Sequence, residues 1–467
     1  MTLSKLVLCI LWMMACFNAI SQKHRVFVLT DIENEPDDAM SFVRFLTYSN
    51  QFDIEGIVAT TSCWQRNKTA EWRLHDITTA YGKVRDNLLI HESGFPTEEY
   101  IHSVIKKGLP VFGKNGLGEG KDSEGSDWLV KAILKNDSRP LYIQAWGGPN
   151  VLAQALYKLQ KSKSKIELKS LIKKLRIYTI SDQDDTGPWI RHTFPDLFYV
   201  VSPGFEENGG GQYHYATWPG ISGDAFHGRF TGADTSIVSN DCLDKNVRYY
   251  HGPLGEKYPR IAFLMEGDSP SFMGLINNGL NDPEHPDFGG WGGRYELYIP
   301  PFKKYMYQAE TRPIWTDTQD EVYSELTHSF HTSNHATIWR WRSAFQNDFF
   351  ARMDWCIAKH YNEANHPPIV RFLHDSILTI QSGSKITLSG TAIDPDGDSL
   401  HYHWMVYKEV GSANINQLNL SISNNQVITF TAPSIKETKT MHVILAVNDL
   451  GTPSLTRYKR AIITIKP

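Results

Sequence analysis

Five carboxylates crowd into one short segment near the N-terminus. The segment reads Thr30-Asp-Ile-Glu-Asn-Glu-Pro-Asp-Asp-Ala39, and its acidic residues are Asp31, Glu33, Glu35, Asp37 and Asp38. Like charges packed this densely repel one another, so the cluster needs a bound cation, protons or water. Oxygen ligands of this kind suit Ca²⁺ or Mg²⁺. A solvated acidic loop before a helix, where Asp is favoured anyway, is the alternative, and spacing alone does not separate the two interpretations.

Alternating strands and helices must position this segment. Runs rich in β-branched and aromatic residues predict strands at residues 25–30, 54–59, 141–145 and 175–180. Between them, apolar residues at helical spacing predict helices at residues 37–49, 71–81 and 151–159. We therefore expect an α/β domain with a mainly parallel sheet and helices on both of its faces.

Polar clusters follow the predicted strands, at residues 31–38, 60–64, 146–150 and 182–189. In open parallel sheets the ligand site lies at the carboxyl ends of the strands, so we expect these clusters to surround one site. Residues 204–232 and 279–300 are rich in Gly, Pro and aromatic residues and predict long ordered loops over the sheet.

The pattern changes toward the C-terminus. Residues 335–364 have apolar anchors at helical spacing, and Asn365-His-Pro-Pro368 breaks the chain after them. Short strands between turn residues follow, which predicts an all-β immunoglobulin-like sandwich. With 467 residues, more than one core is expected. We divide the chain into an α/β domain at residues 23–334, a helical connector at 335–368 and the sandwich at 369–467.

Composition restricts the class of protein. Residues 1–22 resemble a signal peptide, with Lys5, a short apolar run and a small-residue cleavage site, which predicts export to the periplasm or the extracellular space. No later segment is long and apolar enough to span a bilayer. The net charge of −4 gives no basic field for nucleic acid. Cys63, Cys242 and Cys356 would remain after cleavage, enough for one disulfide or three free thiols.

Two motifs resemble those of nucleoside hydrolases. The acidic segment is similar to the signature D-x-D-P-G-x-D-D-A, and Gly148-Pro-Asn-Val-Leu-Ala-Gln-Ala-Leu156 resembles G-P-L-T-N-x-A-x-A-L, one residue shorter. Longer stretches at residues 180–191, 265–272 and 289–295 are similar to the Sde182 cellulose-binding protein family, which has a nucleoside-hydrolase-like domain and an immunoglobulin-like C-terminal domain. This resemblance covers nearly all of the predicted mature chain.

The resemblance implies a Ca²⁺ site. Its ligands would be Asp31, Glu33, Asp38, Asp268 and the backbone carbonyl of Asn150. Asp37 would bind sugar hydroxyls beside the reacting bond. Glu33 would take the place of the general base, although Asp stands there in nucleoside hydrolases and the Pro-Gly that follows it in their signature is Asn34-Glu35 here.

Further residues follow the later strands and are candidates for substrate binding. Asp182, Asp184 and Asp185 could protonate a leaving group, or form a turn or a supporting network. Trp146, Trp189 and Trp291 could stack on sugar rings, or simply pack. Arg191 and Arg294 could hold hydroxyls or an acidic sugar, or form ordinary ion pairs.

Two functions fit these observations. The first is an exported hydrolase of a glycosyl bond in a carbohydrate or nucleoside, with a carboxylate and Ca²⁺ site. The second is a non-catalytic protein that binds a cellulose-like glycan on the same scaffold. The retained Asp37-Asp38 pair favours catalysis, and the altered base position favours binding.

Overall fold

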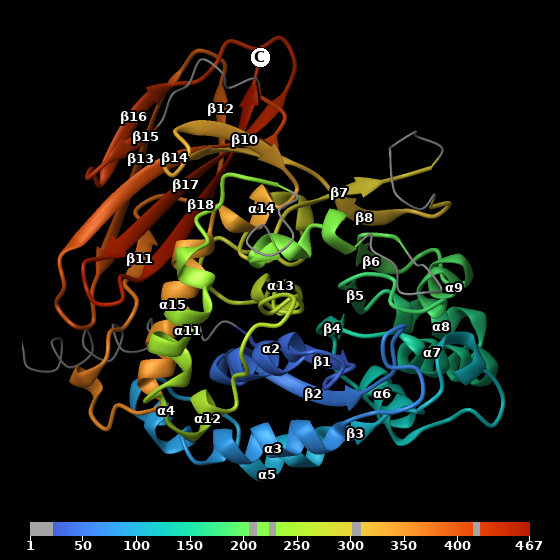
Figure 1. The fold of residues 1–467 in the computed structure, drawn as a ribbon. Helices are drawn as coiled ribbons and strands as arrows, with labels where there is room; N and C mark the ends of the chain where they lie inside the picture. The colour runs from blue at the N-terminus through green and yellow to red at the C-terminus, as the bar shows by residue number, and fades with distance from the viewer. Residues whose placement is uncertain (1–21, 205–212, 224–229, 301–309, 414–420) are drawn as a thin grey trace, which may run out of the picture.

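An eight-stranded sheet organises the N-terminal part of the computed structural model, which describes residues 22–204, 213–223, 230–300, 310–413 and 421–467 (Figure 1). In spatial order its strands are β3 (Ile105–Lys107), β2 (Phe52–Ala59), β1 (His24–Thr30), β4 (Leu141–Ala145), β5 (Leu175–Thr179), β6 (Phe198–Val201), β8 (Ile314–Asp317) and β7 (Tyr295–Tyr298). Within the described strands of this sheet only β7 runs antiparallel to its neighbour, so the expected mainly parallel sheet is confirmed. Most of the predicted signal peptide lies outside the described residues.

The register brings the ends of the central strands to one edge. Thr30 pairs with Ala59, and Ala145 pairs with Thr179. Apart from its first residue, β1 is buried along its whole length, as expected for a central strand covered on both faces. The polar segments that follow these strands therefore start close together.

Helices cover both faces of the sheet. On one face lie α6 (Glu124–Leu134), α7 (Asn150–Ser162), α8 (Lys165–Ile172) and α9 (Thr186–Thr193). On the other lie α2 (Pro36–Thr47), α3 (Glu71–Gly82) and, beside β4 to β6, the segment 270–295. The other α-helices that the structure describes before β7 are α4 (Arg85–His91), α5 (Glu98–Val104), α11 (Asn240–Leu243), α12 (Gly252–Glu256) and α13 (Pro270–Met273). No described helix has the length and apolarity of a membrane span.

A β-sandwich forms the C-terminal part, drawn in orange and red in Figure 1. One sheet contains β11 (Ile369–Phe372), β13 (Lys385–Ile393) and β16 (Val427–Thr431). The other contains β12 (Ile377–Gln381), β18 (Thr456–Lys466), β17 (Lys439–Asp449), β14 (Leu400–Gly411) and β15 (Ser421–Ser423). Buried side chains such as Leu388, Trp404 and Leu445 fill the space between them. The predicted sandwich is thus present.

The helical part of the connection between the two parts ends earlier than expected, at Trp355 instead of residue 364. The hairpin β9 (Asp320–Ser324) and β10 (Ser329–Ser333) leads into α14 (Ala336–Trp339) and α15 (Arg342–Trp355). Beyond Trp355 the chain has only one 3-10 turn before the sandwich. Cys63, Cys242 and Cys356 are all free.

The two parts share one hydrophobic core. Tyr407 and Tyr458 of the sandwich belong to the same cluster of buried residues as α2 and α15. Asp320, which has no exposed surface, joins them through charge: Arg294 Nε and Arg340 Nη1 each lie 2.7 Å from its carboxylate, and the Tyr407 hydroxyl donates to it at 2.7 Å. Arg294 is therefore part of this interdomain network.

Loss of the Asp320 charge should destabilise the protein strongly. Asp320→Asn keeps the size but removes the carboxylate that Arg294 and Arg340 share, leaving Arg340 only Glu409 at 3.3 Å, and breaking such a buried pair costs about 3–5 kcal/mol. The matched control is Asp196→Asn, because Asp196 is exposed and pairs at the surface with Lys169, at 3.8 Å. Such exposed pairs contribute about 0–1 kcal/mol. Equal unfolding free energies for the two variants in denaturant titrations would contradict this account.

The loss of folding stability caused by Asp320→Asn should also depend on pH. Burial by itself would raise the pKa of Asp320, but Arg340 and Arg294 outweigh burial and lower it. A lowered pKa in the folded state stabilises the protein above the ordinary carboxyl pKa of about 3.9, and that stabilisation is lost as the pH falls through the folded pKa. The difference between wild type and Asp320→Asn should therefore shrink in melts below about pH 4.

Candidate functional site

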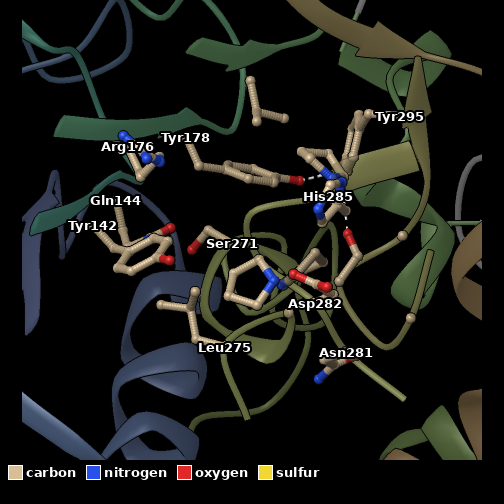
Figure 2. A pocket seen from close by; sticks show the side chains of 18 of the residues that line it. Tyr142, Gln144, Arg176, Tyr178, Ser271, Leu275, Asn281, Asp282, His285 and Tyr295 are labelled. Atoms are coloured by element: carbon tan, nitrogen blue, oxygen red, sulfur yellow. Dashed lines mark hydrogen bonds between the residues drawn. The ribbon is translucent and has the colours of Figure 1, made fainter. Parts of the chain in front are cut away.

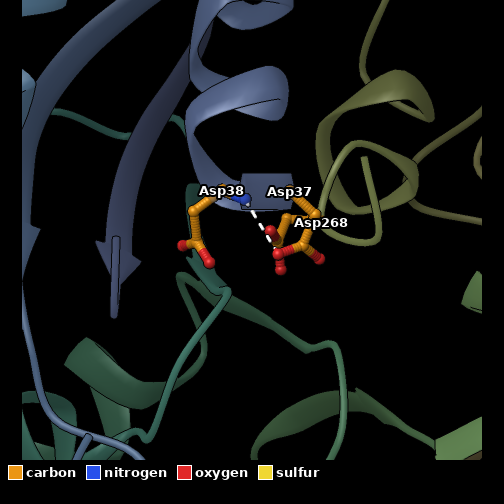
Figure 3. Close-up of side chains that lie close together, drawn as sticks. All are labelled: Asp37, Asp38 and Asp268. Carbon is orange, nitrogen blue, oxygen red and sulfur yellow. Dashed lines mark hydrogen bonds between the residues drawn. The ribbon is translucent and has the colours of Figure 1, made fainter. Parts of the chain in front are cut away.

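Three buried carboxylates from two distant segments meet at the edge of the sheet. Asp37 and Asp38 lie in the first turn of α2, and Asp268 lies just before α13. Figure 3 shows the three side chains directed toward one another, and a carboxylate oxygen of each lies within 4.8 Å of the other two. None is more than 6% exposed. Asp37 and Asp38 of the acidic segment therefore belong to a buried cluster and not to a solvated loop.

Local structure around β1 orients the first two carboxylates. Thr30, the last residue of β1, donates its hydroxyl to Asp38 and accepts a hydrogen bond from the Ile32 amide at 3.1 Å. Pro36 starts α2, a position where its missing amide hydrogen has no cost. The partial positive charge of a helix N-terminus then favours Asp37 and Asp38.

A buried ion pair positions the third carboxylate. Arg44 of α2 holds both oxygens of Glu266, one of them with its Nη2 at 3.1 Å, and neither side chain is exposed. Glu266 has a positive φ of 52° and also accepts from the hydroxyls of Tyr258 and Ser269. This pair fixes the loop two residues before Asp268 against the helix that carries Asp37 and Asp38.

Glycines permit the close approach of carboxylates to the backbone. A Cβ on Gly267 would lie 2.7 Å from Asp37 Oδ2 and 2.8 Å from the Trp218 ring. A Cβ on Gly147, just after β4, would lie 2.7 Å from Asp31 Oδ1. Larger residues at either position would displace a carboxylate of the site.

The carboxylates of the cluster face one another, and no positively charged side chain is among the groups that shift their pKa values. Burial is the main cause that raises the pKa values of Asp37, Asp38 and Asp268, and the neighbouring carboxylates raise them further. Burial also raises the pKa of Asp31 to about 6, and burial together with the charge of Asp31 raises that of Glu35 to about 7. Such repulsion is relieved by protons or by a cation.

The oxygens present fit a hard divalent cation. Asp31 Oδ2 and Asp268 Oδ2 are buried and have no hydrogen-bond partner among the described residues. Buried polar atoms are normally satisfied, so two unpaired carboxylate oxygens beside the cluster fit a cation as their partner. An all-oxygen donor set is typical of Ca²⁺ or Mg²⁺.

Besides Asp31, two residues expected at the metal lie outside the cluster of three. Glu33 has a positive φ of 72° and a carboxylate 3.1 Å from Arg73 Nε of α3, with its side chain 36% exposed. Asn150 begins α7, and its side chain donates to Thr61 and to the Val111 carbonyl, both at 3.0 Å. The structure therefore does not support Glu33 as a metal ligand, and the Asn150 carbonyl stays a prediction.

The three Asp residues after β5 have different surroundings. Asp182 forms a two-point ion pair with Arg191, at 2.7 and 2.8 Å, and Arg191 also contacts Glu310 at 2.6 Å. Asp185 accepts from the Lys114 amide at 2.8 Å. Asp184 is fully buried, its Oδ2 has no described partner, and burial raises its pKa to about 7. Asp184 alone among them has an uncommitted oxygen.

The tryptophans chosen from the sequence pack in the interior. Trp146 and Trp291 are not exposed at all, so neither offers a ring face to a sugar. Trp146 donates its indole NH to Ser271 at 2.9 Å. Trp189 is partly buried and lies edge-on to Phe194, 5.9 Å away. Packing explains all three without a ligand.

A different row of aromatic rings lies beside the carboxylates. Trp64 is 49% exposed and contacts Tyr213 edge-on at 6.5 Å. Tyr213 stacks on Trp218 at 6.2 Å, and Trp218 crowds Gly267 next to Asp37. Burial and the charge of Glu35 raise the pKa of Tyr213, which places this ring near the acidic segment. Sequence reasoning missed Tyr213, since only the fold brings residues 64 and 213 together.

Family comparisons agree with this architecture. Residues 25–295 match the model described as "Cellulose-binding Sde182, nucleoside hydrolase-like domain". Residues 385–465 match the model described as "Cellulose-binding protein Sde0182, C-terminal domain". The chain belongs to the cellulose-binding Sde182 family. The resemblance inferred from the motifs is confirmed.

One solved structure supports the same relationship. A nucleoside hydrolase-related protein from Saccharophagus degradans, described as associated with carbohydrate metabolism, is 32% identical with a TM-score of 0.78, and the match covers 95% of this chain and 100% of that one. Two remote similarities are the effector protein XOO4466, at 7% identity and a TM-score of 0.34, and the type III effector XopQ complexed with adenosine diphosphate ribose, at 8% and 0.33. They cover 67% and 68% of this chain, and 93% of each of those. No curated protein matches the chain.

Calcium should stabilise the protein through this cluster. A ligand that binds only the folded state adds about 2.7 kcal/mol at one hundred times its Kd, so Ca²⁺ should raise the Tm by several degrees and chelation should reverse the rise. Asp38→Asn should abolish the response. Asp185→Asn should retain it, because Asp185 pairs with Lys114 outside the cluster. An unchanged Tm for the wild type across a Ca²⁺ titration would exclude the metal site.

Glu266→Gln should weaken Ca²⁺ binding without removing a ligand. The substitution leaves Arg44 buried without its counter-charge, at a cost of about 3–5 kcal/mol, and loosens the loop that carries Asp268. Asp320→Asn is the comparison, since it should destabilise to a similar extent far from the cluster. Calorimetric Ca²⁺ affinity should fall only in Glu266→Gln. A similar fall of Ca²⁺ affinity in both variants would show that general destabilisation, and not the position of Asp268, causes the weaker binding.

Proposed function

We propose that this protein is an exported hydrolase of a glycosyl bond, N-glycosyl or O-glycosidic, with a carboxylate and Ca²⁺ site. The convergence of buried Asp37, Asp38 and Asp268, with raised pKa values, carries the proposal. Such a cluster is costly to fold unless a bound cation or substrate compensates it. Membership of a family with a nucleoside hydrolase-like domain supports this chemistry.

Asp38, Asp268 and Asp31 would hold the cation, and Asp37 would orient sugar hydroxyls. When bound, Ca²⁺ supplies positive charge that offsets the clustered carboxylates and helps to fix oxygen atoms of the substrate. Clustered carboxylates also stabilise the oxocarbenium-like transition state of glycosyl transfer to water.

Asp31 replaces Glu33 as our candidate general base. Its carboxylate is buried at the end of β1, one oxygen is unpaired, and its pKa of about 6 leaves it ionised at neutral pH. A base with a pKa just below the working pH accepts a proton efficiently. Asp184, with a pKa of about 7 and a free oxygen, is the candidate acid for the leaving group.

A carbohydrate is the substrate class that the surroundings favour. Trp64 and Tyr213, whose rings are partly exposed beside the cluster, offer ring faces to the apolar side of a sugar, and the buried Trp218 supports Tyr213 from behind. The predicted signal peptide would bring the protein to glycans outside the cell, and the family description names cellulose.

Carbohydrate binding without catalysis is the second candidate. The observation that favours it is the position of Glu33, whose carboxylate pairs with Arg73 instead of joining the cluster. In that case the cluster and the aromatic row would bind a glycan with no turnover.

Turnover should depend on Asp31 and not on Glu33. A panel of glycans and nucleosides, assayed with and without Ca²⁺, would first identify the substrate. With that substrate, Asp31→Asn should lower kcat by about 10²–10⁴-fold, the usual contribution of a general base. Glu33→Gln is the matched control and should change kcat little. A larger fall of kcat in Glu33→Gln than in Asp31→Asn would instead identify Glu33 as the general base.

Binding measurements separate the two functions. Calorimetry with the same panel should show that Asp37→Ala binds sugar more weakly than the wild type, because the substitution removes the carboxylate proposed to hold sugar hydroxyls. Sugar binding by the wild type, with no product released from any panel member, would support the non-catalytic function.

A further inference from the structure

A second group of acidic residues lies in the sandwich. The loop between β13 and β14 reads Asp394-Pro-Asp-Gly-Asp398, and Asp449 is the last residue of β17. Leu400 pairs with Asp449 in the register of β14 and β17, and the Leu450 amide donates to the Ser399 carbonyl at 3.0 Å. The loop therefore lies against the end of β17.

Asp449 has one oxygen with several partners and one with none. The residue has no exposed surface, and its Oδ1 accepts three hydrogen bonds. The donors are the Gly451 amide at 3.1 Å, the Leu455 amide at 2.9 Å and Nδ2 of Asn365 at 3.1 Å. Oδ2 is buried and has no hydrogen-bond partner among the described residues. Because buried polar atoms are normally satisfied, Oδ2 indicates a ligand.

Asp394 divides its two oxygens in the same way. Its Oδ1 accepts from the amides of Asp396 at 2.9 Å and Asp398 at 3.0 Å, as is typical of an Asp that starts a turn. Its Oδ2 is buried and has no partner in the part of the chain that the structure describes. The turn explains Oδ1 but gives no reason for a buried Oδ2.

Among the described residues, no positive charge balances Asp394 and Asp449. Burial is the main cause that raises the pKa of Asp449 to about 6, and Asp394 is the only charged side chain among the other causes. Asp449 is therefore ionised at neutral pH, beside a second carboxylate. Asp396, in the same loop, differs because it pairs with His366 at 2.9 Å.

An unpaired buried oxygen does not by itself indicate a cation. Gln144 Oε1 is also unpaired, beside the cavity that Figure 2 shows between β4 to β6 and the segment 270–295. That oxygen belongs to a neutral amide on a single strand. At Asp394 and Asp449 the unpaired atoms are two carboxylate oxygens from two segments, and one cation would satisfy both and relieve their repulsion.

The closed surroundings of these two oxygens suit a metal ion. Ca²⁺ lies about 2.3–2.6 Å from its oxygen ligands, which is closer than the roughly 2.7–2.8 Å of a hydrogen bond between oxygens. Carboxylates that exclude water can therefore still hold the ion between them. A Cβ on Gly451 would lie 2.5 Å from Asp398 Oδ2, which places a third carboxylate oxygen beside the same turn.

We propose that Asp394 and Asp449 bind a Ca²⁺ ion, with Asp398 and water completing its oxygen shell. The ion would join the loop 394–398 to the end of β17. Through the hydrogen bond from Asn365 to Asp449 it would also fix the segment that leads into the sandwich. This site does not depend on the chemistry proposed for the carboxylate cluster.

The two Ca²⁺ sites should be separable by concentration. Affinity for Ca²⁺ depends on the number of charged ligands, and extracellular modules bind it with a Kd of roughly 0.1–1 mM. We expect that range here, because two carboxylates stand in place of the three of the cluster. Micromolar Ca²⁺ would fill only the cluster, so the loss of the thermal response in Asp38→Asn is expected in that range.

Asp38→Asn is therefore the parent for the test. At about 10 mM Ca²⁺, ten or more times the expected Kd, its Tm should rise by about 1–3 °C. Calorimetric titration of the full chain should show one Ca²⁺ bound per chain. Sodium chloride at equal ionic strength is the control for simple screening and should not reproduce the rise, because buried charges are screened little.

Asn at either position removes only the unpaired oxygen. In Asp394→Asn and Asp449→Asn the amide oxygen can still accept the hydrogen bonds made by Oδ1, so the loop and the turn should fold. Each substitution also removes the repulsion between the carboxylates. Added to the parent, each should therefore leave the Tm unchanged or higher in chelator, yet lower than that of the parent in Ca²⁺.

The calorimetric affinity should fall about tenfold or more in both double variants, since each loses a charged ligand. Asp375→Asn in the same parent is the matched control, because it removes an exposed carboxylate of the same domain, and it should bind as the parent does. A Tm in chelator well below that of the parent in both double variants would show that the carboxylates act only in folding, and would overturn the proposal.

Three further results would overturn it. They are no Ca²⁺ binding by the parent up to about 10 mM, equal affinity in the parent and both double variants, or an equal rise of Tm in sodium chloride. Turnover by the wild type is not affected by any of these results, so the function proposed for the cluster is tested separately.

Discussion

The buried ion pair between Arg44 and Glu266 joins the two segments from which the carboxylate cluster is built. Charges removed this completely from water are stable only with close partners, so the pair admits one arrangement of α2 and the loop before α13. Arg44 also donates to the Phe345 carbonyl of α15, at 3.2 Å. The same guanidinium thus ties the site to the helix between the two domains.

The sandwich stabilises the segment 270–295, which follows Asp268 in the chain. The Tyr458 amide donates to the Asn278 carbonyl at 2.9 Å, and Arg460 donates to the carbonyls of Leu280 and Gly289 at 2.8 and 2.9 Å. A Cβ on Gly279 would lie 1.9 Å from the Tyr458 carbonyl oxygen, so only glycine permits this contact. The C-terminal domain therefore contributes to the site without supplying a residue to it, because it holds the backbone of segment 270–295 in place.

Charge at the site and charge at the domain junction are balanced differently. Asp320 is surrounded by Arg294, Arg340 and the Tyr407 hydroxyl, and its pKa falls. Asp37, Asp38 and Asp268 face mainly other carboxylates, and their pKa values rise. Equally buried carboxylates differ because one set has its counter-charges in the protein and the other does not, which is the pattern expected of a structural and a ligand-binding site.

The sequence alone determined the parallel sheet, the sandwich and the acidic segment, because each depends on local periodicity or on adjacent residues. It also yielded Asp37, Asp38 and Asp268, through motifs that survive in short stretches. The sequence did not predict the direction of several side chains. Glu33 has a left-handed backbone conformation and its carboxylate pairs with Arg73. Trp146, Trp291 and Arg294 face the interior. Only the tertiary structure brought Trp64 to Tyr213 and left Gln144 unpaired, because those contacts join segments that no sequence spacing relates.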